Sequence, residues 1–494
     1  CVEIEYNKKE VLHMLDTSKQ YDIIFVDIPV GKFQMDAEMS HKLNIMYSLQ
    51  DEVMKIKTGF QFKEKKYYYT SGLLCLSSYL KEHNFTVGYV NYPKDNNKLK
   101  NMVMTSRYVG FSTVTVSIKM VLALARKLKR INPEVQIILG GYHASYYASQ
   151  LLEENPYIDG IVIGEGEKAV YKLLSGARKD TIEGFSCRMP NGEIYENKNV
   201  CTLEENEIPG CDFSLIEDDI NDYNIYLGTM RGCVGQCNFC INHTYWGMPR
   251  YIPLEKIAEN LQFLYEHLND ICLIHIIDNV FTLNVERLEE LKDILFPMKD
   301  KFVLECDTLA SLIDERKVCL LRDMNVIKIG LGFEDCSERI NKIARKGVNI
   351  SDNIKAAQII RKYGSDICVY AYWLIGLPGT NSESVEENIQ TIQNLIANEV
   401  VHIISPKIFI PYPGTEFWKR SEKYDLHINS YDWSKYERVS PPYPYYLGTF
   451  TEKQLEEALE KIVDVCCIEY IKKWSICLTD LDKTNKVTWY GEIV

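Results

Sequence analysis

The chain has 494 residues, of which 46% are hydrophobic, and its 69 acidic against 56 basic residues give a formal net charge of -13. A chain of this length exceeds one ordinary hydrophobic core, so two or three domains are expected. The acidic balance argues against nonspecific binding to nucleic acid or to an anionic membrane surface. No run of about 18 apolar residues occurs, so no membrane span is expected.

Sixteen cysteines are scattered through the chain, and we find no secretory hydrophobic region before them. Small secreted domains concentrate their cysteines in a disulfide framework, and this spread does not have that pattern. A cytoplasmic location is therefore predicted.

Short β-branched runs alternate with amphipathic segments from Asp22 onward. Two such segments, SGLLCLSSYLKEH and SIKMVLALARKLKRINP, place apolar residues at helical spacing. The expected strands are DIIFVDI, FTVGYVNY, YVGFSTV, VQIILGG and GIVIGEG. This alternation predicts a five-stranded, doubly wound parallel sheet over roughly residues 20–180.

Residues 191–222 are polar, acidic and without periodicity, and are predicted to form a linker. A second α/β series follows, with helical stretches such as PLEKIAENLQFLYEHL, in which apolar residues share one face. Its expected strands are NIYLGTM, ICLIHIID, FVLECD, VIKIGLGFE, ICVYAYWLIG and HIISPKIFIP. Six βα units form a barrel two units short of closure, with its reactive mouth at the carboxyl ends of the strands.

The repeats stop after Phe417, and a helical, tyrosine-rich tail begins. An apolar stripe within it is formed by Leu455, Leu459, Ile462, Val463 and Cys466. We expect this tail to be a small cap over the barrel mouth that contributes substrate selectivity.

Small residues stand at three successive strand ends of the first sheet. They are FST (111–113), GGYH (140–143) and GEGE (164–167). Ligands of doubly wound sheets bind beyond the carboxyl ends of the strands, and glycine lets a ligand approach the backbone closely. These loops are the expected ligand-binding edge.

The most informative motif is RGCVGQCNFC, which spaces Cys233, Cys237 and Cys240 as C-x3-C-x2-C directly after the first barrel strand. An iron–sulfur cubane bound by only three cysteines leaves one iron open for a substrate or cofactor. A ferredoxin-type site would add a fourth nearby cysteine, and none follows before Cys272. Zinc is the main alternative, with His243 as a further ligand.

With these residues the chain resembles the radical S-adenosylmethionine (SAM) superfamily, and Phe239 occupies the aromatic position usual before the last cysteine. Further segments resemble its cobalamin-dependent branch in order: IIDNVFTLN, LECDTLASLIDE, IGLGFEDCSERINKIARKG, WLIGLPGTNSES and FIPYPGTEFWK. In the first domain, VGFSTVTVS and ILGGYHASYYASQLLEENPYIDGIVIGEGEKAV look like the cobalamin-binding domain of such enzymes. The resemblance covers roughly residues 20–420.

The resemblance implies an α/β protein. It would consist of a Rossmann-like cobalamin-binding domain (1–190), a linker (191–222), a partial (β/α)6 TIM-type radical SAM barrel (223–417) and a small, mainly helical C-terminal domain (418–494). The implied cofactors are a [4Fe-4S] cluster held by Cys233, Cys237 and Cys240, SAM, and cobalamin.

Further residues are assigned to SAM by the same resemblance. Arg345 is expected to pair with a carboxylate, since its guanidinium suits bidentate binding, and Glu305 to reach a ribose or the substrate. The positions that match the family's SAM contacts are Asp278, Asn279, Glu334 and Gly376 to Pro378. Asp335 departs from the family, because many members have serine there, so that contact is open.

The resemblance likewise implies the cobalamin contacts. Those expected along the loops are Ser112, Thr113, Gly140, Gly141, Tyr142, His143, Gly164, Glu165 and Gly166. The D-x-H-x-x-G motif that supplies a histidine ligand to cobalt in related domains is absent from the sequence. A long insertion and YYYTSG stand in its place, so we expect a cobalt without a histidine lower ligand, faced by Tyr69, Thr70 or Ser71, with packing as the alternative for the tyrosines.

The resemblance implies a cobalamin-dependent radical SAM methyltransferase. A 5′-deoxyadenosyl radical would remove hydrogen from an unactivated carbon of a small-molecule or peptide substrate, and methylcobalamin would supply the methyl group. A flavodoxin or ferredoxin-like protein is the expected electron donor, and no nucleic-acid partner is expected.

Two other functions stay open. The same cofactors could serve ring formation, cyclisation or rearrangement, or the chain could be a non-catalytic cobalamin or iron–sulfur sensor, although no output module is recognised. A methylthiotransferase is disfavoured, because such enzymes place three cluster cysteines in the N-terminal domain and residues 2–186 contain only Cys75.

Overall fold

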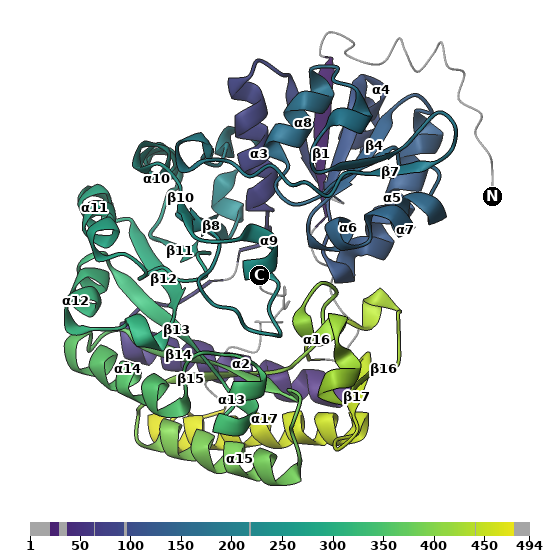
Figure 1. The fold of residues 1–494 in the computed structure, drawn as a ribbon. Coiled ribbons are helices and arrows are strands. Elements are labelled where there is room, and N and C mark those ends of the chain that lie inside the picture. Colours follow the sequence, from purple (N-terminus) through teal and green to yellow (C-terminus); the bar gives the residue numbers. More distant parts are fainter. Residues whose placement is uncertain are drawn as a thin grey trace. The chain divides into compact units, whose positions relative to one another are not determined.

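The computed structural model describes residues 20–28, 37–63, 65–92, 96–216, 219–439 and 441–478 (Figure 1). The chain divides into two compact units. Unit 1 comprises residues 1–29 and 69–217, and unit 2 comprises residues 30–68 and 218–494. Each unit has its own sheet, mixed in unit 1 and parallel in unit 2.

The sheet of unit 1 has the strand order β2-β1-β3-β4-β5-β6-β7. Its strands are β1 (Tyr21–Asp27), β2 (Val87–Asn91), β3 (Ser106–Ser112), β4 (Gln136–Gly140), β5 (Gly160–Val162), β6 (Phe185–Arg188) and β7 (Ile194–Glu196). The first five strands are parallel, as the sequence predicts, whereas β6 and β7 pair antiparallel. Part of the segment expected to be a linker is therefore an edge strand.

Helices cover both faces of this sheet (Figure 1). They are α3 (Ser71–Glu82), α4 (Asn96–Met104), α5 (Ile118–Ile131), α6 (Tyr142–Tyr146), α7 (Ala148–Glu154) and α8 (Glu167–Leu174). α3 packs against α8, and α4 packs against α5. Because β1 lies between β2 and β3, the crossover direction reverses there, and the carboxyl ends of β1 and β3 form the switch point of the sheet.

The sheet of unit 2 is parallel, with the order β15-β14-β13-β12-β11-β8, and confirms the predicted six-stranded partial barrel. Its strands are β8 (Ile225–Leu227), β11 (Cys272–Ile276), β12 (Phe302–Thr308), β13 (Val326–Glu334), β14 (Cys368–Ile375) and β15 (Ile403–Ile408). Its helices include α9 (Asn242–Trp246), α10 (Leu254–His267), α11 (Val285–Leu295), α12 (Glu315–Asp323), α13 (Glu338–Ile343), α14 (Ile350–Tyr363), α15 (Ser382–Ala397) and α16 (Glu416–Lys419). Two short antiparallel pairs complete it: β9 (Met230–Arg231) with β10 (Arg250–Tyr251), and β16 (Leu426–Ile428) with β17 (Tyr445–Leu447).

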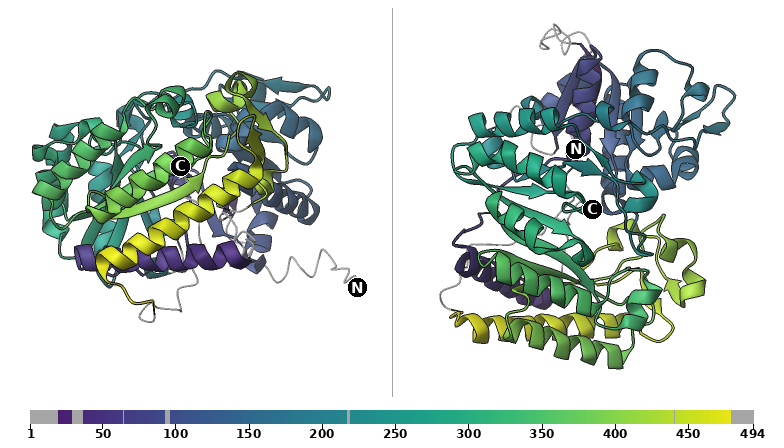
Figure 2. Two further views of the ribbon diagram at one scale, coloured as in Figure 1. Left: turned by 90° about the horizontal axis from the view of Figure 1, so that it is seen from below. Right: turned by 60° about the vertical axis from the view of Figure 1, so that its left-hand side comes forward.

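The structure differs from the expected domain division at helix α2 (Ala37–Thr58). This helix lies in the long insertion between β1 and α3, yet it belongs to unit 2. It packs against β14, β15 and the C-terminal helix α17 (Glu452–Trp474), and Figure 2 shows α2 and α17 side by side. An insertion of the first domain thus contributes to the second.

α2 and α17 protect the edge strand of the partial barrel. Gln50 Nε2 on α2 donates a hydrogen bond of 2.8 Å to the carbonyl of Ile404 on β15. The N–H of Ile404 donates to the hydroxyl of Tyr470 on α17 at 2.7 Å. Side chains therefore satisfy backbone groups that an open sheet edge would leave unpaired.

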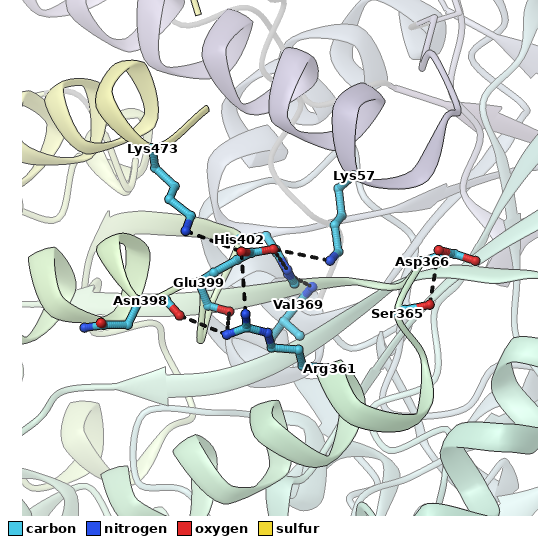
Figure 3. A network of polar contacts seen from close by, with 9 residues as sticks. All are labelled: Lys57, Arg361, Ser365, Asp366, Val369, Asn398, Glu399, His402 and Lys473. Atoms are coloured by element: carbon cyan, nitrogen blue, oxygen red, sulfur yellow. Dashed lines mark hydrogen bonds and ion pairs between the residues drawn. The ribbon is translucent and has the colours of Figure 1, made fainter. Parts of the chain in front are cut away.

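A cluster of charges joins the same elements at the amino end of β15 (Figure 3). The Glu399 carboxylate lies 3.6 Å from Lys57 of α2, 3.7 Å from Arg361 of α14 and 3.4 Å from Lys473 of α17. Beside it, His402 accepts a backbone hydrogen bond from β14 through Nδ1, and burial lowers the pKa of His402 to about 3. The ring is therefore neutral, and Glu399 carries the charge that holds the three helices.

The C-terminal tail is part of unit 2, and its expected place as a cap over the barrel mouth stays a prediction. The predicted apolar stripe of α17 is confirmed, with Leu455, Leu459 and Val463 fully buried. This stripe contacts α15, α2 and β15. Within the described ranges, no helix combines the length and the apolar character that a membrane span requires.

Candidate active site

The strand β13 explains how charged groups gather on one face of the barrel sheet. Ile329, Leu331 and Phe333 point to the helices and are fully buried. The alternate positions Gly330 and Gly332 therefore face the opposite side, which we call the inner face. Because these two glycines have no side chains, the inner face has room for groups from other elements.

The cysteine loop follows β8 and β9, as predicted, and is held by backbone contacts. Gly232 has φ +96°, and a Cβ there would overlap the backbone of Met248, so only glycine fits. Asn238 donates from its backbone N–H to the carbonyl of Ala344 at 2.8 Å and from its amide to that of Ile343 at 2.7 Å. These bonds fix the loop to the end of α13.

The three thiols fit an iron–sulfur cluster. Cys233, Cys237 and Cys240 are all half-buried. The sulfur of Cys233 accepts the N–H of Gly235 at 3.3 Å, and that of Cys240 accepts the N–H of Asn242 at 3.4 Å. Across the described ranges no three His, Cys, Asp or Glu side chains converge on a single ion, which a cubane does not require, since each thiolate binds a different iron.

The electrostatics of the loop favour thiolates only when positive charge is present. Burial raises the pKa of all three thiols, that of Cys240 to about 12, while the Lys346 ammonium acts in the opposite direction on each. Binding to iron would supply the missing positive charge.

Lys346 is a residue that the sequence reasoning missed. Its ammonium lies 2.6 Å from the Glu334 carboxylate, and both side chains are nearly buried. Burial by itself lowers the pKa of Lys346, but Glu334 and the thiolate of Cys237 outweigh it and hold that pKa above its usual value. A Cβ at Gly332 would overlap both ends of this pair, so the glycine provides its space.

Arg345, expected as the carboxylate partner, lies at an exposed position with φ +53°. Its role stays a prediction. The local sequence RKG does not indicate whether Arg345 or Lys346 faces the inner side of the barrel sheet. The left-handed backbone at Arg345 and the turn after α13 determine that Lys346 does.

Asp278 and Asn279 both hold the cysteine loop. Asp278 is buried and accepts the backbone N–H of Thr229 at 2.6 Å and that of Met230 at 3.1 Å. Burial raises the pKa of Asp278 to about 6 against these hydrogen bonds. Asn279 donates to the carbonyl of Gly232 at 3.1 Å. The structure thus gives them a supporting place, and their expected contact with SAM stays a prediction.

The loops after β13 and β14 are also fixed by packing. Asp335, which replaces the serine common in the family, is buried and accepts the amide of Asn388 at 2.9 Å. Gly376 has φ +86°, and its carbonyl accepts the hydroxyl of Tyr445 at 3.0 Å. Pro378 is buried behind it. A segment from the C-terminal tail therefore shapes the loop expected to contact SAM.

Glu305 lies within β12 and not at its carboxyl end. It contacts His275 on β11, and its carboxylate lies 2.5 Å from Lys328 on β13. Burial alone would raise the pKa of Glu305, but the charges of His275 and Lys328 outweigh it and hold that pKa well below its usual range. Its expected contact with a ribose or the substrate stays a prediction.

In unit 1, the carboxyl end of β1 meets the start of α3. Asp27 accepts the N–H of Thr70 at 2.5 Å, its hydroxyl at 2.7 Å and the hydroxyl of Tyr89 at 2.5 Å. Burial outweighs these bonds and raises the pKa of Asp27. Tyr69 is buried against Phe213, which fits the packing alternative. Asp27 was not foreseen, although it ends the first predicted strand.

The neighbouring loops of β3 and β4 interlock through glycine. Gly141 has φ +89°, and a Cβ there would lie 2.6 Å from the carbonyl oxygen of Thr113 and 3.1 Å from the hydroxyl of Ser112. The Thr113 hydroxyl donates to the Gly140 carbonyl at 2.8 Å and accepts the N–H of Ala144 at 3.1 Å. Glycine at position 141 is therefore required for the two loops to pack against each other, and their expected contact with cobalamin stays a prediction.

The remaining loop residues support this edge. His143 is buried beside Thr115, and burial lowers the pKa of His143 to about 4. Tyr142 is half-buried, and Gly164 has φ +74°. Gly166 precedes α8, and the buried Glu165 accepts the N–H of Leu203 at 3.0 Å. Ser71 begins α3 beside Thr70.

Comparison with known proteins assigns both units. Residues 63–174 match the family model of the B12 binding domain, and residues 227–392 match that of the radical SAM superfamily. An uncharacterized methyltransferase of Pyrococcus horikoshii is 28% identical over 368 residues, which cover 72% of this chain and 77% of the relative. The anaerobic magnesium-protoporphyrin IX monomethyl ester cyclase of Rubrivivax gelatinosus is 22% identical over 388 residues, covering 74% and 68%.

The fold is shared with a solved structure, that of the cobalamin-dependent SAM radical enzyme OxsB. The TM-score is 0.68 at 16% identity, and the match covers 93% of this chain and 69% of the other. The chain thus combines a B12-binding domain with a radical SAM domain. It is a cobalamin-dependent radical SAM enzyme, with a [4Fe-4S] cluster, SAM and cobalamin as cofactors.

Proposed function

We propose that this enzyme is a C-methyltransferase that acts on an unactivated carbon. The observation that carries the proposal is the presence of three cluster-type thiols beside the buried Lys346–Glu334 pair in a chain that also has a B12-binding domain. The similarity to a relative named as a methyltransferase supports it. When bound, the cluster with SAM supplies a carbon-centred radical, and cobalamin supplies the methyl group.

In this proposal Cys233, Cys237 and Cys240 bind three irons of the cluster. Lys346 and Glu334 have opposite charges, so they suit the carboxylate and amino groups of SAM, respectively. The Gly332 position keeps them at the inner face. Their charge-assisted bonds would orient SAM toward the open iron before the reaction.

In unit 1, the glycine loops at Gly140 and Gly141 would hold the nucleotide tail of cobalamin. The Thr70 hydroxyl is oriented by Asp27, so the start of α3 offers a hydroxyl where related domains supply a histidine. A cobalt without a histidine ligand is consistent with homolytic transfer of the methyl group.

Ring formation is the second candidate. The similarity to an anaerobic cyclase favours it, because that relative matches 74% of this chain. It would use the same thiols and the same Lys346–Glu334 pair, and it would differ in the placement of the substrate. A sensor without catalysis is disfavoured, because a polar inner face would then have no use.

The test is an anaerobic assay of the protein reconstituted with cluster, cobalamin, SAM and a reductant. Mass spectrometry measures S-adenosylhomocysteine and 5′-deoxyadenosine. We expect both products, and we expect Cys237→Ala to abolish 5′-deoxyadenosine while Cys319→Ala, a thiol on α12, does not. Formation of 5′-deoxyadenosine without any S-adenosylhomocysteine would overturn the methyltransferase and favour the second candidate.

A further inference from the structure

The inner face of the barrel sheet carries an apolar cluster at the amino ends of its strands. Leu273, Val303 and Ile327 form a cluster there, and Phe60 and Phe62 from the insertion pack against it. Closed barrels continue such aliphatic layers through their interior. Here the apolar layer forms a base, and the next residues along the strands are polar or charged.

The first polar layer is a row of side chains in register across the strands. His275 pairs with Tyr226 on one side and with Glu305 on the other, and Glu305 pairs with Lys328. The Tyr226 and His275 rings stack at 4.7 Å, and the Lys328 ammonium lies 4.7 Å from the centre of the Tyr370 ring. Because the Lys328 ammonium lies 2.5 Å from the Glu305 carboxylate, this row is a charge-compensated floor.

Above the floor lie Asp307 and Tyr372. The Tyr372 hydroxyl donates to both carboxylate oxygens of Asp307, at 3.0 and 3.2 Å. A Cβ at Gly330 would overlap Asp307 and come within 2.8 Å of the Tyr372 ring, so this glycine makes the space for the pair. Lys407 is nearby, with its ammonium 5.8 Å from the centre of the Tyr372 ring.

Two glycines on β13 thus leave space for two polar pairs. Gly330 leaves space for Asp307 with Tyr372, and Gly332 leaves space for Lys346 with Glu334. Positions two residues apart on a strand are about 6.6 Å apart. The Asp307 pair is therefore one step along the inner face from the pair beside the cluster thiols.

The charged side chains of this floor stay partly accessible to solvent. The side chains of His275, Glu305 and Lys328 are 16%, 14% and 15% exposed, whereas Ile329 on the helix side has no exposure. Covering a charged side chain with a ligand has a desolvation free energy. This free energy is smaller when the ligand is polar and can form hydrogen bonds with the charged group than when the ligand is apolar.

We propose that Asp307, oriented by Tyr372, binds a hydrogen-bond-donating group of the substrate, an amine or a hydroxyl, over the floor formed by Tyr226, His275, Glu305, Lys328 and Tyr370. The substrate is then a polar molecule and not a hydrocarbon. This rests on the proposed function in one respect: the substrate must lie where a radical formed beside the thiols can reach it.

The first experiment measures binding to the reconstituted holoenzyme by equilibrium dialysis. The probes are 2-phenylethylamine, 2-phenylethanol and 3-phenylpropanoate, which share a ring and differ in the terminal group. We expect the amine or the alcohol to bind more tightly than the carboxylate. Asp307→Asn should weaken the better probe by about tenfold or more, since a neutral amide replaces the charged carboxylate acceptor.

Tyr372→Phe is the second variant, and it should weaken the same probe by a smaller factor because Asp307 loses its orientation. The matched control is Asp366→Asn, at an exposed position before β14. Equal binding of all three probes, or Asp307→Asn binding like Asp366→Asn, overturns the proposal.

A second readout separates the two proposals. Formation of 5′-deoxyadenosine without probe reports the cluster and SAM alone, and the control Asp366→Asn should retain it. If the wild type forms none but binds the amine through Asp307, the proposed function fails and this inference stands. If the wild type forms 5′-deoxyadenosine but Asp307→Asn binds the probes as tightly as the wild type does, this inference is wrong and the proposed function is unaffected.

Discussion

Gly141→Ala is expected to disrupt the cobalamin edge of unit 1. Gly141 has φ +89° and ψ 179°, a conformation that is essentially restricted to glycine and costs about 1–3 kcal/mol for other residues. The added Cβ would also lie 2.6 Å from the carbonyl oxygen of Thr113 and 2.7 Å from its nitrogen. Backbone atoms cannot turn away as a side chain end can, so the two loops must separate.

The substitution also lowers the stability of unit 1 by breaking hydrogen bonds between the two loops. Thr113 accepts the N–H of His143 at 3.3 Å through its carbonyl and that of Ala144 at 3.1 Å through its hydroxyl. Losing both adds about 2 kcal/mol to the conformational strain. We expect a total of about 3–5 kcal/mol, which in a unit of this size lowers the melting temperature by about 10 °C.

The assay is thermal unfolding followed by circular dichroism, together with cobalamin binding measured by absorbance. Cobalamin affinity should fall, because the separated loops no longer present one edge. Gly72→Ala is the matched control, since Gly72 has nothing within 4 Å of its Cβ position and no positive φ. If Gly141→Ala unfolds at the same temperature and binds cobalamin as Gly72→Ala does, the loop argument is wrong.

Three further perturbations test unit 2. Tyr470→Phe leaves the buried N–H of Ile404 without its 2.7 Å partner, so we expect a loss of about 1–3 kcal/mol and faster hydrogen exchange at that amide; unchanged exchange would contradict the role of α17 as an edge cover. Burial raises the pKa of Glu437 to about 8, above its unfolded value of 4.5. The folded state therefore binds more protons than the unfolded state between pH 4.5 and about 8, and stability must fall as the pH rises through this range. Between pH 6 and 8 the wild type should lose about 2 kcal/mol more than Glu437→Gln in urea unfolding, and equal slopes would refute this. Glu399→Ala removes the acceptor of three cations and should cost about 1–2 kcal/mol, less at high salt, because the carboxylate is partly exposed; a salt-independent loss would indicate packing.

Local patterns were sufficient for much of the fold. The β-branched runs predicted all five parallel strands of unit 1 and all six of unit 2, because they alternate along the chain with helical segments, as parallel sheets require. The stripe of α17 was predicted because its apolar residues recur at helical spacing. The cysteine motif is also local, since its three thiols lie within one loop.

The sequence could not place elements whose partners are distant in the chain. α2 lies between β1 and α3 in the chain, so the sequence placed it in the first domain, and only contacts with β14, β15 and α17 assign it to unit 2. The same holds for the packing partners of the tail helix α17, which are α15, α2 and β15. Its stripe shows that one face is buried, but not against which elements.

What the sequence by itself determined is the chemistry of single segments: three spaced thiols, glycines at strand ends, and alternating strands and helices. Tertiary structure decided which charges meet. Lys346 turns inward and its neighbour Arg345 outward, Asp278 supports a loop, and Asp307 lies over Gly330. The physical reason is that a motif consists of residues close together in the chain, so its pattern is visible in the sequence. The two members of a charge pair come from segments far apart in the chain, and only the pairing of strands brings them together.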